Sequence, residues 1–273
     1  MVSVVVPTYN NVAYVARTVE SILGQTYSPM EVVIADHAST DGTWDVVSSF
    51  ERDERVRLLR TEPGGGAHRN WNRVTDAASG TFVKLVCADD LLYPTCLQEQ
   101  VEAMMQHPEA VMAACRRDIV DAKGELLLGG RGLPGMSGQV EGPQAVRAAV
   151  RAGTNIFGEP ACVLFRTDVV REVGGWSPAE YLIDMDLYVR VLGRGPLVAL
   201  DRTLAAFRVS RSQWSVALVA EQGRQAHRFH RQLREAGQPG LSEWDARVGM
   251  GRAYGNAVAR RLLYTWWGSR LTP

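Results

Sequence analysis

Two adjacent carboxylates, Asp89 and Asp90, directly follow the apolar run Phe82–Val86, which is typical of a buried strand. Neighbouring negative charges at such a place repel each other unless a positive group neutralises them. A divalent cation that bridges to a diphosphate would do so, because Mg²⁺ in proteins takes one or two carboxylates together with phosphate oxygens. One aspartate would be enough to cap the following helix, so the pair favours a metal site at Asp89 and Asp90.

Polar side chains also follow two other apolar runs. A turn that combines a hydroxyl, an aromatic ring and an amide follows Val2–Val6, and it suits either a nucleotide base or a simple helix cap. Asp36 follows Val32–Ala35 and has no capping role, because Ser39 and Asp41 stand closer to the next helix. A carboxylate at a strand end can accept hydrogen bonds from a ribose or a base. The turn after Val2–Val6 consists of Pro7, Thr8, Tyr9 and Asn10.

These residues must be positioned by alternating strands and helices. The sequence predicts strands at Val2–Val6, Val32–Ala35, Val56–Leu59, Phe82–Val86, Val111–Cys115 and Cys162–Phe165. It predicts helices at Val12–Leu23, Thr43–Phe50, Asn70–Ala78, Thr95–Gln106 and Asp184–Leu192. Such alternation indicates an α/β fold with βαβ units and a parallel sheet. Ligands of these sheets bind at the carboxyl ends of the strands, where the polar residues stand.

Five of these segments, in this order, resemble family 2 glycosyltransferases. The resemblance covers roughly residues 2–215 and implies the GT-A fold, an αβα sandwich with a mostly parallel central sheet that holds a nucleotide-diphospho-sugar and usually a metal. The matching segments are Ser3–Asn10, Gln25–Thr26, Glu31–Thr43, His68–Asn70 and Ala88–Asp90.

The resemblance also implies roles for single residues. The implied metal ligands are Asp89 and Asp90, with Mg²⁺ or Mn²⁺ as the cofactor. The implied catalytic base is Asp184, within Tyr181–Arg190. Asp184 and Asp186 are two residues apart and so point to different faces of a helix, and we expect Asp184 to face the cleft. The residues implied to bind the nucleotide sugar are Pro7, Thr8, Tyr9, Asn10, Asp36, Arg69 and Asp89.

The implied reaction is transfer of a hexosyl-type sugar to an acceptor hydroxyl with inversion at the anomeric carbon. Asp184 would accept the proton of the attacking hydroxyl. The donor sugar, its base and the acceptor stay open, and the acceptor could be a glycan, a lipid-linked molecule or a small molecule.

Three positions depart from the common family pattern. They are His37, Cys87 and Ser210, the last of which stands where many members have a histidine. We therefore keep as an alternative a catalytically weak or inactive nucleotide-sugar-binding protein of the same fold. Because a histidine is missing near Ser210, Arg208 or Arg211 could supply positive charge to the diphosphate.

We divide the chain into a glycosyltransferase domain over residues 1–215 and a basic helical extension over residues 216–273. The first would consist of a nucleotide-sugar-binding half, about 1–116, and an acceptor half, about 117–215. The extension would form two helices that are broken around Gly237–Gly240. Glycines crowd the stretch Gly129–Gly142, which predicts a mobile loop or lid over the substrate.

The formal net charge of zero results from two opposite halves. Residues 1–201 contain 18 basic and 26 acidic side chains, whereas residues 202–273 contain 12 basic and 4 acidic ones. A net charge of zero argues against a uniformly basic nucleic-acid-binding protein. Arg224, Arg228 and Arg231 would share a helix face, and Arg260–Trp267 combines basic and aromatic residues. This tail leaves open a solvated face, core packing, a dimer contact or contact with an anionic membrane.

The four cysteines lie far apart in the sequence, which argues against a zinc site and for a reducing compartment. No run of about 18 apolar residues is present. We therefore expect a cytoplasmic protein, with the inner face of the membrane as a place where the tail could hold it.

Overall fold

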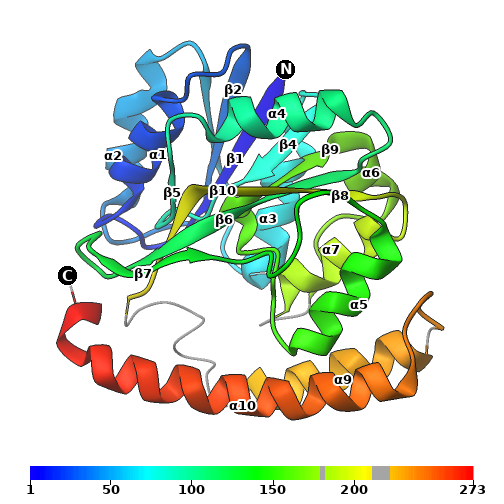
Figure 1. Cartoon of the computed structure of the whole chain (residues 1–273). Helices are drawn as coiled ribbons and strands as arrows, with labels where there is room; N and C mark the ends of the chain where they lie inside the picture. The colour runs from blue at the N-terminus through cyan, green and yellow to red at the C-terminus, as the bar shows by residue number, and fades with distance from the viewer. Residues whose placement is uncertain (179–181, 211–221, 236, 273) are drawn as a thin grey trace.

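A mixed β-sheet with helices on both faces forms the body of the molecule (Figure 1). The computed structural model describes residues 1–178, 182–210, 222–235 and 237–272. The strands follow the order β3-β2-β1-β4-β9-β6-β10-β5, while β7 pairs with β6 and β8 pairs with β10. The predicted α/β sandwich is therefore confirmed.

The first half of the sheet is parallel throughout, as predicted. It contains β1 (Val2–Thr8), β2 (Met30–Asp36), β3 (Val56–Arg60) and β4 (Phe82–Leu85). The chain passes from β1 to β3 in one direction and then returns to the other side of β1, so right-handed crossovers place the first two connecting helices on one face of the sheet and the third on the other. These helices are α1 (Val15–Leu23), α2 (Thr43–Ser48) and α3 (Gly66–Asp76).

The second half of the sheet mixes strand directions. β6 (Met112–Val120) and β10 (Leu197–Arg208) are parallel, whereas β9 (Val163–Arg166) lies antiparallel between β4 and β6. The short strands β5 (Leu91–Leu92), β7 (Leu126–Arg131) and β8 (Gly138–Val140) are also antiparallel to their partners. The central sheet is thus mixed, and the expected parallel order holds only for its first half.

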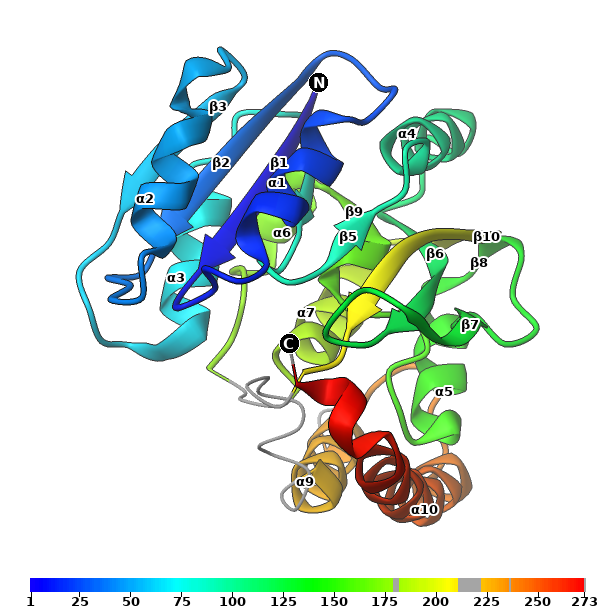
Figure 2. The same cartoon turned by 90° about the vertical axis from the view of Figure 1, so that its left-hand side faces the viewer.

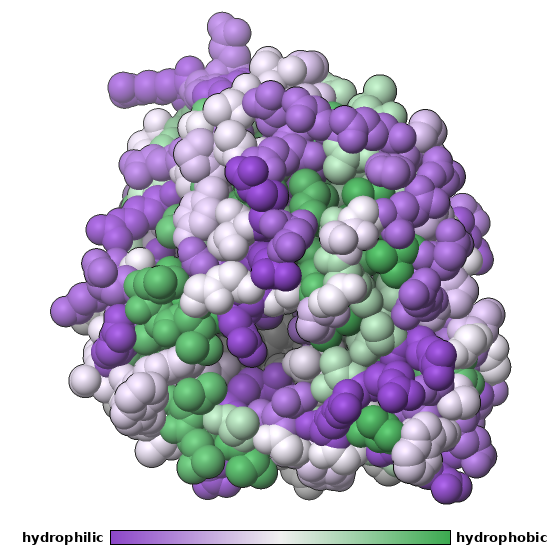
Figure 3. Space-filling view, viewed as in Figure 1, coloured by the Kyte–Doolittle hydropathy of each residue, from purple (hydrophilic) through white to green (hydrophobic). Residues whose placement is uncertain are grey.

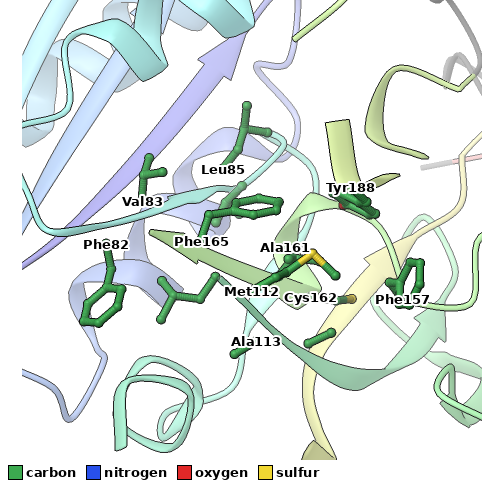
Figure 4. Packing of buried hydrophobic residues seen from close by; sticks show 14 of the residues in the cluster. Phe82, Val83, Leu85, Met112, Ala113, Phe157, Ala161, Cys162, Phe165 and Tyr188 are labelled. Carbon is green, nitrogen blue, oxygen red and sulfur yellow. The ribbon is translucent and has the colours of Figure 1, made fainter. Parts of the chain in front are cut away.

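The remaining helices of the body cover this second half. They are α4 (Cys96–Gln106), α5 (Gly142–Ala152), α6 (Thr167–Glu172) and α7 (Ile183–Leu192). Buried side chains from both halves meet in one core, where Phe82 of β4, Met112 of β6, Phe165 of β9 and Tyr188 of α7 are almost completely buried (Figure 4). This shared core fixes β4 and β9 side by side and so joins the two halves into one body.

The predicted loop over Gly129–Gly142 is a loop only in part, at residues 132–137 and 141. The stretch contains the end of β7, all of β8 and the first residue of α5. Leu133, between the two strands, is completely buried. Glycine is needed here because Gly130 and Gly132 adopt positive φ angles of 59° and 116°, which side chains disfavour.

The extension forms two helices, as predicted, and they pack side by side against the body (Figures 1 and 2). They are α9 (Gln222–Glu235) and α10 (Glu243–Trp267). The Asp245 carboxylate at the start of α10 accepts hydrogen bonds from Arg147 Nε and Arg151 Nη1 of α5, at 2.9 and 2.7 Å. No helix in the described ranges is both long enough and apolar enough to span a lipid bilayer.

Gly153, which ends α5, allows the closest approach between α5 and α10. It has a φ of +64°, and a Cβ placed on it would lie 2.4 Å from Ala253 N and 2.5 Å from Gly249 O. Both contacts are to backbone atoms, so α10 as a whole would have to move.

We predict that Gly153→Ala lowers the free energy of unfolding by at least about 1 kcal/mol, the cost of left-handed backbone for an L-residue. Displacement of α10 adds to that loss. The measurement is the thermal unfolding midpoint. The matched control is Gly255→Ala in α10, where a Cβ meets no atom within 4 Å and helix propensity favours alanine. Equal midpoints for the two variants would contradict the proposed close packing.

Candidate active site

A cavity of about 1230 Å³ lies at the carboxyl ends of β1 and β2 and extends to α10. Figure 3 shows a hollow on this face of the molecule, surrounded mainly by hydrophilic residues. We call it the central cavity. Of the residues expected from the sequence to act in catalysis or binding, Pro7, Thr8, Tyr9, Asn10, Asp89, Asp90 and Asp184 line it.

The ends of β1 and β2 bring Thr8 beside Asp36 in the strand register. Both side chains are buried, and both Thr8 Oγ1 and Asp36 Oδ1 lack a hydrogen-bond partner within the described residues. The second oxygen of Asp36 accepts a hydrogen bond from Ser39 N at 3.1 Å. Asp36 does not line the central cavity, whereas its neighbour His37 does. The edge of the sheet thus contains two buried polar atoms without partners in the described residues, Thr8 Oγ1 in the cavity wall and Asp36 Oδ1 directly behind it.

Tyr9 and His37 form the rim of the cavity above this edge. Tyr9 is 58% exposed, and its ring lies edge-on to that of His37, with centroids 6.1 Å apart. Asn10 joins the two loops, since its Oδ1 accepts a hydrogen bond from Thr40 N at 2.9 Å. An exposed ring on a fixed loop can stack on a planar ligand.

Arg69 does not reach the cavity, contrary to the sequence expectation. Its side chain is exposed, lies over Gly65 and donates weakly to Gly64 O at 3.5 Å. The next residue, Asn70, lines the cavity instead, and its Nδ2 donates to Ala35 O at 3.1 Å.

Asp89 and Asp90 lie on the cavity wall after β4. Asp90 is completely buried, and its Oδ1 accepts a hydrogen bond from the Arg208 backbone at 3.2 Å. Burial, with the negative charges of Asp89 and Glu159, raises the pKa of Asp90 well above its usual range. The other oxygen, Oδ2, has no hydrogen-bond partner among the described residues.

This arrangement fits a divalent cation. The nearby Arg208 does not offset the burial that raises the pKa of Asp90, and Asp90 Oδ2 has no hydrogen-bond partner among the described residues. Within the described residues no three His, Cys, Asp or Glu side chains gather as ligands for one metal ion. Two carboxylates agree with the coordination of a cation whose other ligands are water and phosphate.

Arg208 holds the turn that carries Asp89 and Asp90. Its guanidinium is buried over the ring of Tyr14, 4.8 Å from the centroid, and donates to Asp89 O at 2.9 Å. It also donates to Asp121 O and Ala122 O, at 3.2 and 3.1 Å. Arg208 is 1% exposed and is not among the residues that line the cavity, and its Nε and Nη1 donate to backbone carbonyls, so its observed contacts hold the turn. Arg211, the other candidate, lies outside the described residues.

Asp184 lies in the first turn of α7, and its carboxylate faces the central cavity. Its Oδ2 accepts a hydrogen bond from Asn155 Nδ2 at 2.7 Å, and its Oδ1 accepts one from Met185 N. Burial raises the pKa of Asp184 to about 7, and the charge of Glu159 adds to this, while the two hydrogen bonds lower the pKa. Asp186 instead pairs with Arg190 at 2.6 Å and does not line the cavity. As expected from helix geometry, Asp184 faces the cavity and Asp186 does not.

Sequence reasoning missed two residues that act on these carboxylates. Arg117, from β6, is paired with Glu159 through Nε and Oε2, at 2.5 Å. Asn155 holds Asp184 and also donates to Gly158 O. The two adjacent arginines at 116 and 117 could have been noticed as charges late in a strand, whereas no local pattern marks Asn155.

The far wall of the cavity belongs to α10, which sequence reasoning placed outside the site. Its lining residues are small or polar near the middle of the helix and aromatic near its end. They are Ala253, Asn256, Ala259, Arg260, Leu263, Tyr264 and Trp267.

Comparison with known proteins agrees with this geometry. The family model described as glycosyl transferase family 2 matches residues 3–174. An uncharacterized protein of Mycobacterium tuberculosis, MT1568, is 31% identical over 215 residues, which are 76% of this chain and 67% of that protein. The putative teichuronic acid biosynthesis glycosyltransferase TuaG of Bacillus subtilis is 36% identical over 107 residues, which are 39% of this chain and 42% of TuaG.

Among solved structures, TarS 1-349 of S. aureus in complex with UDP-GlcNAc has a TM-score of 0.71 at 18% identity, covering 94% of this chain and 72% of that one. The mannosyltransferase PcManGT of Pyrobaculum calidifontis, in complex with GDP-Man and Mn²⁺, has a TM-score of 0.64 at 19% identity, covering 98% and 75%. The likeness to these structures shows the shared GT-A fold. The matched family model covers more than half of the chain, and the chain therefore belongs to glycosyl transferase family 2.

Proposed function

We propose that this chain transfers a sugar from a nucleotide-diphospho-sugar to an acceptor hydroxyl, with inversion at the anomeric carbon. The observation that carries the proposal is the position of Asp184, a half-buried carboxylate of pKa about 7 in the same cavity as Asp89 and Asp90. The complexes of TarS with UDP-GlcNAc and of PcManGT with GDP-Man support the class of donor.

The donor would occupy the part of the cavity at the strand ends. Thr8 Oγ1 lines the cavity, is unpaired within the described residues and offers a hydrogen-bonding group to the base or ribose, while Asp36 lies buried directly behind it and Tyr9 offers a ring for stacking. Asp89 and Asp90 would hold a divalent cation, Mg²⁺ or Mn²⁺. When bound, such a cation neutralises negative charge on the leaving diphosphate. We assign these roles to Pro7, Thr8, Tyr9, Asn10, Asp36, Asp89 and Asp90, and remove Arg69 from the set.

The reaction would be one displacement. An oxygen–carbon bond forms between the acceptor hydroxyl and the anomeric carbon while the bond from that carbon to the diphosphate oxygen breaks on the opposite side, which inverts the configuration. The Asp184 carboxylate accepts the hydroxyl proton. A pKa near 7 makes it a stronger base than an ordinary aspartate and still leaves it ionised in a large share of molecules at neutral pH. Asn155 keeps the carboxylate oriented toward the cavity.

We predict that Asp184→Asn lowers sugar transfer by about 10²- to 10⁴-fold, the usual contribution of a general base. The measurement is nucleoside diphosphate release from a panel of UDP- and GDP-sugars with Mn²⁺. Asp186→Asn is the matched control, two residues away in the same helix and outside the cavity. Thermal shift with the nucleotide should give the same binding for both variants. Release at the wild-type rate by Asp184→Asn would remove Asp184 as the base.

Substitutions at the two neighbours of Asp184, Asn155 and Glu159, should shift the pH dependence of kcat/KM in opposite directions. Because the ionised form is the base, wild-type kcat/KM should rise with pH through about 7. Asn155→Ala removes a hydrogen bond that lowers the pKa of Asp184, so the rising limb should move to higher pH. Glu159→Gln removes a charge that raises this pKa, so the limb should move to lower pH.

If the rising limbs of Asn155→Ala and Glu159→Gln move in the same direction, Asp184 is not the base whose ionisation sets the pH profile. Glu159→Gln leaves Arg117 without its carboxylate, so its thermal midpoint must be measured alongside. Because the folded state penalises ionised Asp184, this group should lower stability as pH rises from about 4 to 7, which provides a second readout.

Asp90→Asn should weaken binding of the metal and nucleotide without lowering the stability of the ligand-free protein. Since Asp90 is a buried carboxylate with a raised pKa, its neutralisation should leave the thermal midpoint unchanged or raise it. The increase in midpoint that UDP or GDP with Mn²⁺ gives the wild type should disappear in this variant. Asp76→Asn, an exposed position at the end of α3, is the control. A metal-dependent increase that persists in Asp90→Asn would remove Asp90 from the metal site.

A further inference from the structure

The aromatic and aliphatic residues of α10 divide between two faces of the helix. Trp267 packs with Leu271 and the body residues Ile119 and Val209, and is buried. On the opposite side, four large side chains at intervals of four residues face solvent, and together they form what we call the outer stripe. Their exposed fractions are 51% for Tyr254, 61% for Val258, 66% for Leu262 and 81% for Trp266.

We propose that the outer stripe binds the surface of an anionic lipid bilayer, with α10 lying parallel to that surface. Residues four apart lie on one face of a helix, so the four side chains form a continuous apolar band. Hydrophobic residues gather over the C-terminal half of α10 in Figure 3. A contiguous exposed band of this kind marks an interaction surface, and tryptophan and tyrosine rings suit the boundary between lipid and water.

The charges beside the stripe determine which partner it fits. From Ala246 to the end, the sequence contains five arginines and no acidic residue. Arg247, Arg252, Arg261 and Arg270 are all exposed, and Arg261 directly precedes Leu262 in the stripe. A helix with an apolar face flanked by arginines is the pattern of helices that lie in the lipid interface. Two-fold pairing of two copies through the same stripe would instead bring these arginines close to one another.

The predicted stripe on α9 contributes less to the argument. Arg228 and Arg231 are exposed, as expected, but Arg231 lies within 3.8 Å of Glu235. The side chain of Arg224 lies outside those described. We therefore restrict the proposed surface to α10, where Arg252 and Arg261 lie beside the stripe. Arg247 is paired with Glu243 at 3.4 Å, and Arg270, which follows the helix, is paired with Asp121 at 2.9 Å.

The position of the stripe also relates it to the central cavity. Asn256 and Arg260 line the cavity from the opposite face of the same helix. A bilayer on the outer stripe would thus lie one helix diameter, about 10 Å, from the cavity wall. Lipid binding itself requires only the outer face of α10, so it stands or falls independently of the proposed sugar transfer.

The experiment is flotation of the full chain with two kinds of vesicle, phosphatidylcholine alone and phosphatidylcholine with 30% phosphatidylglycerol. We expect flotation with the anionic vesicles at low salt and at least a fivefold weaker partition with neutral ones. Raising the salt concentration should also weaken binding, because charges at the surface are screened. Absence of flotation with anionic vesicles at low salt would overturn the proposal.

Variants locate the binding to the stripe. Leu262→Asp combined with Trp266→Asp should reduce the partition at least tenfold. Arg261→Gln, which keeps the apolar band, should reduce it severalfold at low salt only. The control is Met105→Asp on α4, an equally exposed apolar side chain on another part of the surface (66%). Thermal midpoints check that each variant folds, and Arg261→Gln serves as the test if the double variant does not.

Other results would assign the stripe to another partner. Equal flotation of the double variant and the control would place the lipid contact elsewhere on the chain. A wild-type dimer in sedimentation equilibrium that the double variant loses, without any flotation, would assign the stripe to a second copy. Either result overturns the proposal.

Discussion

Repulsion among buried carboxylates is the constraint around which the cavity is built. Asp89, Asp90, Glu159 and Asp184 all line it, and each raises the cost of ionising its neighbours. Two arginine side chains, from the adjacent parallel strands β6 and β10, lie beside these carboxylates. Arg117 of β6 neutralises Glu159 directly, whereas Arg208 of β10 fastens the backbone of the turn and leaves Asp90 Oδ2 without a partner in the described chain. The remaining negative charge lies where a bound cation would complete the site.

Local sequence patterns predicted the strands and the positions that follow them. Runs of β-branched residues identify buried strands, and the end of a strand fixes where the next polar residue must lie, so Thr8, Asp89 and Asp90 could be placed from sequence. Helix geometry likewise separated Asp184 from Asp186. Arg69 and Arg208 could not be placed in this way. The direction of Arg69 depends on the glycine turn beneath it, and the burial of Arg208 depends on Tyr14, which is almost two hundred residues away in sequence.

Composition was a weaker guide than pattern. Six glycines in Gly129–Gly142 indicated a loop, yet glycine serves there to let short strands turn sharply beside β6 and β10. The basic tail resembled a separate extension because its charge differs from that of the body. The first turn of α10 is nevertheless bound to α5, because Asp245 accepts hydrogen bonds from Arg147 and Arg151. These residues are about a hundred positions apart in the sequence. Tertiary contacts of this length leave no trace in one sequence.

The shape of the cavity has a consequence for how such a chain can change over time. One wall consists of strand ends whose side chains are constrained by charge and by the core, so few substitutions there are neutral. The other wall is formed by α10 together with Ala226 and Phe229 of α9. On α10, Asn256 donates hydrogen bonds to Ala152 O and Gly153 O, whereas Ala259 is exposed. A larger side chain at Ala259 would reduce the volume open to a second substrate of the proposed reaction and would leave these hydrogen bonds in place. For the proposed reaction, selectivity for the second substrate could therefore change at Ala259 while the residues at the strand ends stay the same.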